Sequence, residues 1–563
     1  MAILEDLIRA IELWLRVAKE QVPLVDPTLD PVLLVPGIAG SILEAVDDAG
    51  NKERVWVRIL AAEHEFRDKL WSKFDASTGK TVSVNKKTSI VVPEDQYGLY
   101  AIDTLDPDMI IGDDTVYYYH DMIVEMIKWG YQEGKTLFGF GYDFRQSNRL
   151  SETLDRFSKK LESVYKASGG KKINLITHSM GGLLVKCFVS LHSDVFEKYV
   201  KSWIAIAAPF QGAPGYINTS LLNGMSFVEG WESKFFISKW SMQQLVCLIH
   251  SSNTLDVFMW LSLRRKEILI FFSAQLLECP SIYELLANSN FHWKDTPLLQ
   301  IWREKLDDNG KKNALLESYE PAEAIQMIEE ALSKHEIISN GMHIPLPLNG
   351  DILKWAKETH DIICKTKLPE SVKFYNIYGI DYDTPHTVCY GSEHHPISNI
   401  SHLLHAQGKY VYVDGDGSVP TESAKADGLN AIARVGVAAD HRGIICNHQV
   451  FRIVQHWLHA GEPDPFYDPL TDYVILPTIL EFEKYCEKHG YRKSVWEDWE
   501  IISPKDKEII RSAELPPMVS MLSASREGKE RSREEVQAAV IVHPEKKGRQ
   551  HVEVRAVGVS HGA

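Results

Sequence analysis

The chain has 563 residues, 44% hydrophobic and 25% charged, which is typical of a globular protein with two or three average domains or one large decorated domain. Its formal net charge of −16 argues against a nucleic-acid partner and against simple adsorption to anionic lipid. The seven cysteines include no C-x-x-C pair, so neither a disulfide framework nor a zinc site is predicted, and reduced thiols in a cytoplasmic protein are expected.

Residues 1–30 are predicted to contain an amphipathic helix. Acidic residues stand where a signal peptide would be basic. The polar face of the helix is not basic either, so packing on the chain's own core is favoured over binding to a membrane surface. No uninterrupted apolar run in the sequence is long enough to span a bilayer. The helical spacing is carried by Ile3, Leu4, Leu7, Ile8, Ile11, Leu15 and Val17.

Residues 31–215 are predicted to form the first part of an α/β core. Strand patterns at 31–37, 137–143, 173–176 and 202–207 alternate with helical patterns at 150–164 and 183–191. Such alternation predicts an α/β fold with a mainly parallel sheet and helices on both faces.

A candidate nucleophile lies in Thr177-His-Ser-Met-Gly-Gly182, where a buried strand turns sharply into a helix. A serine in a strand–turn–helix context is typical of the nucleophile elbow of α/β-hydrolases. The match is imperfect because Thr177 occupies the position of the first glycine of that motif. From this segment alone, an ordinary serine in a loop remains the alternative to a catalytic Ser179.

The later part of the chain departs from this alternation and then returns to it. Residues 216–370 are predicted to form a helical and irregular cap over the sheet. Strands at 372–378 and 410–413 and a helix at 449–458 indicate a second core segment at 371–480. Residues 481–563 form a C-terminal extension, and the polar composition after about 515 predicts disorder.

Partners for the serine are expected downstream, because α/β-hydrolases follow the order Ser, Asp or Glu, His. Asp416 lies in a glycine-rich turn after a strand and is preferred over Asp414. His441 lies in a loop before the last helix and is preferred over His448. The oxyanion formed on attack needs two donors. The amide of Met180 is the first, and the amide of Ile38 or its neighbour, after the strand at 31–37, is the second.

With these pieces in order, the chain from about residue 30 to about 480 resembles the lecithin:cholesterol acyltransferase-like family, most closely its plant phospholipase members. The resemblance implies an α/β-hydrolase with the triad Ser179, Asp416 and His441 and with oxyanion amides at Ile38 and Met180. It also implies a lid near residues 50–75, where Trp56 and Trp71 would contact lipid. The matching segments are Pro31-Val-Leu-Leu-Val-Pro-Gly37, Thr177-His-Ser-Met-Gly-Gly182, Ala208-Pro-Phe-Gln-Gly212, Asp414-Gly-Asp-Gly-Ser-Val-Pro420 and His441-Arg-Gly-Ile444.

Two departures from the family bear on activity. Secreted relatives carry a disulfide in the lid, whereas no cysteine here precedes Cys187, so phospholipase A activity is expected rather than sterol acyl transfer. Residues 246–275 form a segment of 30 residues that interrupts the family pattern between Leu245 and Leu276. We interpret this segment as a retained intron or a gene-model error, which sequencing of the transcript would test.

The resemblance implies cleavage of a glycerophospholipid acyl ester through an acyl-enzyme on Ser179, with water or a lipid alcohol as acceptor. The alternatives are transfer to a sterol or another lipid alcohol, and a catalytically weak, lipid-binding regulatory protein. The expected partners are a phospholipid substrate and, peripherally, a membrane surface, with no nucleic acid. No metal cluster or dinucleotide fingerprint is found in the sequence, so no cofactor is expected. The acyl position, the head group and the oligomeric state stay open.

Overall fold

The computed structural model describes residues 25–56, 69–70, 72–106, 116–223, 276–306, 310, 312–339 and 342–461, together with the backbone of strands β18 to β22. The chain divides into two compact units. Residues 1–432 with 439–468 form the first, and residues 433–438 with 469–563 form the second. Every predicted site residue that the structure describes belongs to the first unit.

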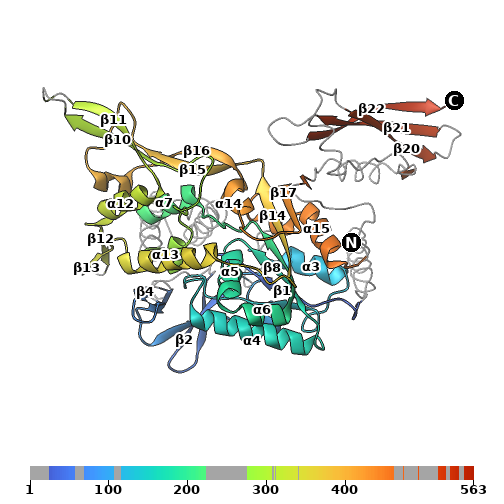
Figure 1. Cartoon of the computed structure of the whole chain (residues 1–563), viewed down its shortest axis with the longest axis horizontal. Helices are drawn as coiled ribbons and strands as arrows, with labels where there is room; N and C mark the ends of the chain where they lie inside the picture. Colours follow the sequence, from blue (N-terminus) through green and yellow to red (C-terminus); the bar gives the residue numbers. More distant parts are fainter. Residues whose placement is uncertain are drawn as a thin grey trace, which may run out of the picture. The chain divides into compact units, whose positions relative to one another are not determined.

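A parallel sheet forms the centre of the first unit (Figure 1). Its strands in this unit run in the order β14-β9-β8-β1-β7, and each neighbouring pair is parallel. All residues of β1 and β8 are buried, as expected of central strands covered on both faces. The bounds are β1 (Val32–Val35), β7 (Leu137–Gly139), β8 (Ile173–His178), β9 (Val200–Ile206) and β14 (Lys373–Ile380).

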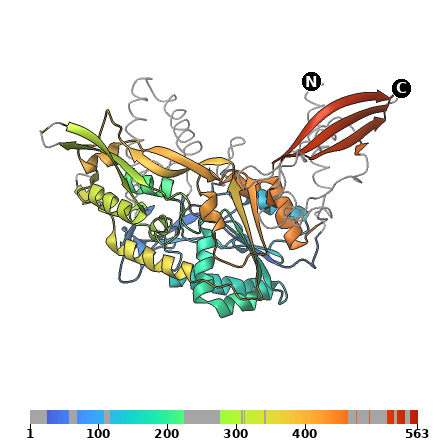
Figure 2. The same cartoon turned by 45° about the horizontal axis from the view of Figure 1, so that its top comes forward.

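Helices lie on both faces of this sheet (Figures 1 and 2). On one side α4 (Ser151–Ala167), α5 (Gly181–Leu191) and α6 (Ser193–Tyr199) pack together beside β8 and β9. On the other side lie α3 (His120–Lys128) and α15 (His448–Leu458). This arrangement confirms the predicted α/β-hydrolase fold.

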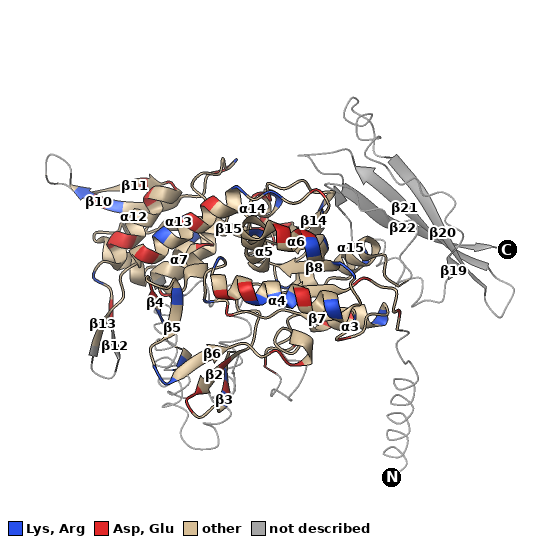
Figure 3. Ribbon diagram, turned by 60° about the horizontal axis from the view of Figure 1, so that its bottom comes forward, with Lys and Arg blue, Asp and Glu red and all other residues tan. Residues whose placement is uncertain are grey.

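The packing of α4 follows its sequence pattern. Its apolar residues recur every three or four positions and are buried, as the spacing predicted. Phe157 contacts Phe188 of α5 edge-on, with ring centroids 4.9 Å apart. The outward turns of α4 carry both acidic and basic residues, so this helix presents no patch of a single sign (Figure 3).

The region predicted as a helical, irregular cap at 216–370 also contains strands, which corrects that prediction. β10 (Leu299–Leu306) and β11 (Lys312–Tyr319) form an antiparallel ribbon within a four-stranded sheet ordered β11-β10-β15-β16. The strand predicted at 410–413 is part of β16 (Lys409–Gly415), which pairs with β15 (Tyr382–Tyr390) and not with the parallel sheet. Charged and apolar residues are mixed along β10 and β11, so their pattern is too weak to indicate strands from sequence.

The remaining elements of the first unit are short or lie at its edges. The described residues between 43 and 98 include a three-stranded sheet ordered β3-β2-β6, a β4–β5 hairpin and the turn η1. Their bounds are β2 (Leu43–Asp47), β3 (Lys52–Trp56), β4 (Ser72–Asp75), β5 (Lys80–Ser83), β6 (Thr88–Val91) and η1 (Gln96–Gly98). The others are α7 (Pro214–Asn223), α11 (Pro280–Tyr283), α12 (Pro321–Leu332), β12 (Glu336–Ser339), β13 (Met342–Pro345), α13 (Gly350–Cys364), η3 (Ile400–His405), α14 (Thr421–Lys425) and η4 (Gly443–Cys446).

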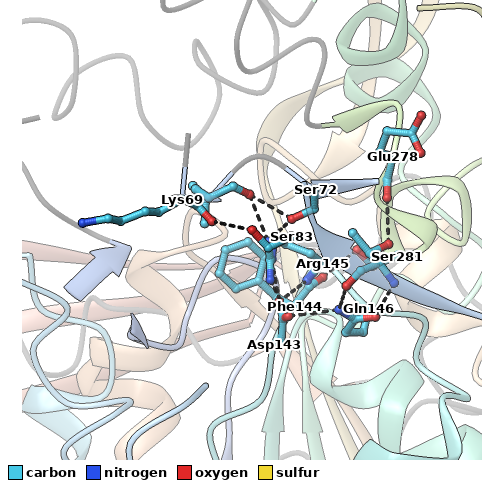
Figure 4. Close-up of polar contacts among 11 residues, drawn as sticks. Lys69, Ser72, Ser83, Asp143, Phe144, Arg145, Gln146, Glu278 and Ser281 are labelled. Atoms are coloured by element: carbon cyan, nitrogen blue, oxygen red, sulfur yellow. Dashed lines mark hydrogen bonds and ion pairs between the residues drawn. The ribbon is translucent and has the colours of Figure 1, made fainter. Parts of the chain in front are cut away.

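A buried polar junction joins the β4–β5 hairpin to the core (Figure 4). Arg145 is 2% exposed, and its guanidinium binds both oxygens of Asp143 at 2.9 and 2.7 Å. The same group donates to the carbonyl of Leu70 at 3.0 Å and to the hydroxyl of Ser72. Burial raises the pKa of Asp143, but the charge and hydrogen bonds of Arg145 outweigh burial, so this pKa is lowered. The pair therefore stays ionised where little water reaches it.

In the second unit, β17 (Ala433–Ala438) pairs in parallel with β18 (Tyr473–Val474). A separate antiparallel sheet is ordered β19-β20-β21-β22. This backbone arrangement differs from the disorder predicted after about residue 515. Residues of high β propensity, such as Val540, Ile541 and Val542, stand within the polar composition on which that prediction rests. The bounds are β19 (Arg492–Lys493), β20 (Met518–Glu527), β21 (Arg533–His543) and β22 (His551–Gly562).

Several predictions fall outside the described residues. These are the amphipathic helix within residues 1–24, the interrupting segment 246–275 and the lid tryptophan Trp71. Among the helices that the structure does describe, none combines the length and the apolar character needed to cross a bilayer.

Replacement of Arg145 by Met tests the junction. The variant keeps most of the side-chain volume but leaves Asp143 without its ionic partner, so we expect a loss of about 3–5 kcal/mol in the free energy of unfolding. Urea unfolding followed by circular dichroism measures it. The control is Arg156→Met, because Arg156 pairs with Glu94 in a partly exposed site and should change stability by about 1 kcal/mol or less. Equal losses in the two variants would contradict the stabilising role of the buried Arg145–Asp143 pair.

Candidate active site

The turn between β8 and α5 holds Ser179 in a left-handed backbone conformation, with φ of 52°. A non-glycine residue rarely adopts this conformation, and it is sustained by the packing around the turn. A Cβ at Gly181 would lie 2.4 Å from the carbonyl oxygen of Pro36, and a Cβ at Gly182 would lie 2.5 Å from the Cβ of Ala208. The two glycines therefore let α5 start directly against the ends of β1 and β9.

Thr177 fits where the elbow motif usually has glycine. Its side chain is buried, and its hydroxyl accepts a hydrogen bond of 2.9 Å from the indole N–H of Trp203 on β9. The threonine is thus part of the packing between β8 and β9, and the imperfect match to the motif does not alter the turn.

The three predicted catalytic side chains lie in one hydrogen-bonded line. Nε2 of His441 is 2.9 Å from Oγ of Ser179, and Nδ1 of His441 is 2.7 Å from Oδ2 of Asp416. The side chain of Asp416 is 1% exposed and that of His441 is 12% exposed. The arrangement can move a proton from the serine hydroxyl to the imidazole while the carboxylate holds the ring.

The carboxylate of Asp414, the alternative candidate acid, is hydrogen-bonded to residues outside the Ser–His–Asp line. Its carboxylate accepts from the amide of Asp381 at 2.7 Å and from the hydroxyl of Thr421 at 3.1 Å. The second oxygen of Asp416 is held by the amides of Ser418 and Val419, at 2.9 and 2.7 Å. These bonds leave Oδ2 of Asp416 directed at the imidazole.

His441 and the alternative His448 occupy different surroundings. His448 is exposed at the first turn of α15 and stacks edge-on against Phe451. Burial lowers the pKa of His441, but the charge of Asp416 and its hydrogen bond outweigh burial, so the pKa of His441 is raised above its usual value. The carboxylate therefore favours the proton-accepting role of His441.

The loop after β1 carries Ile38, the predicted second oxyanion donor. Gly37 donates to the hydroxyl of Tyr118 at 2.8 Å, and the carbonyl of Ala39 accepts from the indole of Trp56 at 2.8 Å. In the described part of the chain, neither the amide of Ile38 nor that of Met180 has an acceptor. Both residues therefore keep an N–H group available beside Ser179, Ile38 as a residue of the pocket wall and Met180 as the next residue of the chain.

A mainly apolar pocket opens over the Ser179 hydroxyl. The pocket is partly open to solvent. Ser220 and Ser418 add polar groups to its wall. The apolar part of the wall includes Ala213, Tyr216, Ile217, Ile282, Leu285 and Val419. A pocket of this character accepts an apolar chain and holds a polar group near the serine.

The predicted lipid contact of Trp56 does not fit its position. The side chain is 3% exposed, lies edge-on against Phe144 at 5.4 Å and donates to the loop that carries Ile38. Trp56 therefore supports that loop from inside the protein. An indole is apolar but carries one N–H donor, so it suits a buried site as well as a membrane interface. The sequence therefore does not distinguish a buried Trp56 from one that contacts lipid.

Two polar side chains behind the serine were not predicted from the sequence to belong to the site. His178 lies in the same motif as Ser179, and Tyr118 precedes α3. Both are buried and border the pocket. A histidine directly beside a candidate nucleophile was the available signal, but no sequence feature connects Tyr118 to it. Among the described residues, no group of three or more His, Cys, Asp and Glu side chains is arranged to hold a metal ion.

Known proteins resemble this chain in sequence. The chain is 55% identical over 563 residues to lecithin-cholesterol acyltransferase-like 4 of Arabidopsis thaliana, with 99% of each protein covered. It is 46% identical over 433 residues to phospholipase A(1) LCAT3 of the same plant, which covers 76% of this chain and 90% of that protein. The human lysosomal phospholipase A and acyltransferase is 26% identical over 214 residues, which is 34% of this chain and 50% of that protein.

A sequence model described as lecithin:cholesterol acyltransferase matches residues 52–429, more than half of the chain. The family-level resemblance of the motifs is therefore confirmed, and the chain belongs to the lecithin:cholesterol acyltransferase family.

Proposed function

We propose that the protein is a serine-dependent acyl hydrolase or acyltransferase that cleaves fatty-acyl esters of glycerophospholipids. The observation that carries this proposal is the line of hydrogen bonds from Ser179 through His441 to Asp416, which lies beneath an apolar pocket. The names of the relatives, which include a phospholipase A(1) and a phospholipase A and acyltransferase, support the same class of reaction.

In the proposed reaction, Ser179 Oγ attacks the ester carbonyl while Nε2 of His441 takes the hydroxyl proton. Asp416 holds the ring and stabilises the imidazolium that forms. The oxyanion is bound by the amides of Ile38 and Met180. His441 then gives the proton to the leaving alcohol, and the acyl group stays on Ser179. A second alcohol or water, activated by His441, releases the acyl group and restores the serine.

The substrate class follows from the pocket wall. Apolar side chains of α7 and α11 suit the acyl chain, and the serines suit the glycerol and ester oxygens. Hydrolysis and transfer use the same side chains and differ only in the acceptor that reaches the acyl-enzyme. We favour water as the main acceptor, because the lid disulfide that the resemblance associates with secreted sterol acyltransferases has no counterpart before Cys187.

We also propose a cytoplasmic protein that meets its substrate at a membrane surface. The five cysteines of the described chain are free thiols, which suits a reducing compartment. A phospholipid resides in a bilayer, so the pocket mouth must approach that surface for a substrate to enter. The alternative of a catalytically weak lipid-binding protein is less well supported, because such a protein needs no Ser–His–Asp line.

Replacement of Ser179 by Ala tests the nucleophile. We expect fatty-acid release from phosphatidylcholine vesicles, measured by mass spectrometry, to fall by at least about 10³-fold, since the acyl-enzyme can no longer form. The matched control is Ser190→Ala on α5, whose hydroxyl bonds only to the backbone of Ile362. Both variants should unfold at the wild-type temperature to within a few degrees. Release by the Ser179 variant at the control's rate would refute the assignment.

The pH dependence of the reaction tests the base. The imidazole must be neutral to accept a proton, so kcat/KM should fall as the pH drops through the pKa of His441, with a midpoint above about 6.5. Asp416→Asn removes the charge that raises this pKa. We expect the midpoint to move to lower pH and kcat to fall by about 10³- to 10⁴-fold. Profiles on a soluble ester measure both, and an unchanged midpoint would contradict the role of Asp416.

A further inference from the structure

A second line of hydrogen bonds runs behind the candidate serine. The amide of Gly37 donates to the hydroxyl of Tyr118 at 2.8 Å. The Tyr118 hydroxyl lies 2.6 Å from Nδ1 of His178, and Nε2 of His178 lies 2.8 Å from the carbonyl oxygen of His441. This line joins the loop after β1 to the loop that carries His441.

The chemistry of the two ends fixes every proton in the line. An amide N–H only donates and a carbonyl oxygen only accepts. Nε2 of His178 must therefore carry the proton that reaches the His441 carbonyl. Nδ1 of the neutral ring is then an acceptor, and the Tyr118 hydroxyl donates to it while accepting from Gly37. Hydrogen bonds that run in one direction polarise and strengthen one another.

The surroundings keep His178 neutral. Its side chain is 1% exposed, and Tyr118 is 4% exposed. Burial, followed by the nearby His441, lowers the pKa of His178 well below its usual value. The two imidazole rings lie 5.0 Å apart, so a charge on His178 would oppose the charge that His441 acquires during the reaction.

The line adds to the hydrogen bonds that hold the backbone and the ring of His441. The backbone amide of His441 donates to the carbonyl of Asp416 at 2.8 Å, and its ring is held by the carboxylate of the same residue. The carbonyl of His441 is held by His178. Arg442 donates a hydrogen bond of 2.7 Å to the carbonyl of Tyr117, so residues 117–118 are connected to the His441 loop directly through Tyr117 and indirectly through His178.

The loop on the other side is shaped around the same tyrosine. A Cβ at Gly40 would lie 2.5 Å from the ring of Tyr118, so only a glycine lets the loop approach the ring this closely. Because Gly37 is bonded to Tyr118, the adjacent peptide of Ile38 keeps one orientation. A shift of Tyr118 would therefore move an oxyanion donor and the base together.

We propose that Tyr118 and His178 are positioning residues that set the distance between the Ile38 amide and the His441 imidazole. This inference rests on the proposed function and adds to it two residues outside the Ser–His–Asp line. Neither residue touches the substrate's reacting atoms; each acts through its neighbour.

Tyr118→Phe tests this role, because it removes a single oxygen atom from the line. We expect kcat for a soluble ester to fall by about 10- to 100-fold with KM changed by less than about 3-fold, since the variant loses a hydrogen bond of the line but keeps the ring that borders the pocket. Tyr119→Phe is the matched control. Tyr119 is equally buried, and its hydroxyl donates only to the carbonyl of Val35. This control should retain wild-type kcat at a similar cost in stability.

Two variants of His178 give a second, independent measurement. His178→Gln keeps an N–H group that reaches the His441 carbonyl, and His178→Ala does not. We expect the Gln variant to recover about 10-fold or more of the kcat that the Ala variant loses. Equal kcat in these two variants, or a Tyr118→Phe variant as active as Tyr119→Phe, would overturn the inference while leaving the proposed function intact. A wild-type chain that releases no fatty acid would overturn both.

Discussion

The hydrogen bond of 2.7 Å between Asp416 and His441 is the contact on which the rest of the candidate site depends. The carboxylate is almost fully buried, and a buried charge is stable only when its oxygens are paired. Two backbone amides take one oxygen, and the imidazole takes the other. This division fixes the proton on Nδ1 of His441 and leaves Nε2 as the acceptor for Ser179. In the proposed reaction, one buried carboxylate thereby determines the tautomer, the ring orientation and the direction of proton transfer.

The parallel sheet makes this contact possible, because neighbouring parallel strands end at the same edge. Ser179 follows the last residue of β8, and β1, its neighbour, ends at the loop that carries Ile38. The left-handed conformation of Ser179 opposes folding, and the surrounding packing sustains it. Nine consecutive residues of α5 are buried, so the helix that follows the turn cannot shift without loss of core contacts. The central strands and α5 thus act as a rigid support for loops distant in sequence.

The sequence predicted the parts of this structure that repeat a simple pattern. The core strands, the amphipathic α4 and the order Ser179, Asp416, His441 follow from apolar spacing and turn residues. The ribbon of β10 and β11 could not be predicted, because its charged and apolar residues do not alternate cleanly. Nor could the positions of Tyr118 and Trp56, which depend on contacts between segments far apart in the chain. A buried indole and an interfacial indole have the same sequence signature, and only the fold separates them.

The most direct test of Ser179 as an activated nucleophile is covalent labelling by a fluorophosphonate. This reagent reacts with a serine only when a base and an oxyanion site activate it. After incubation of the full-length protein, mass spectrometry of its peptides locates the adduct. We expect one adduct on Ser179, formed faster as the pH rises through the pKa of His441. Absence of labelling, or an adduct on a different serine, would contradict this role of Ser179.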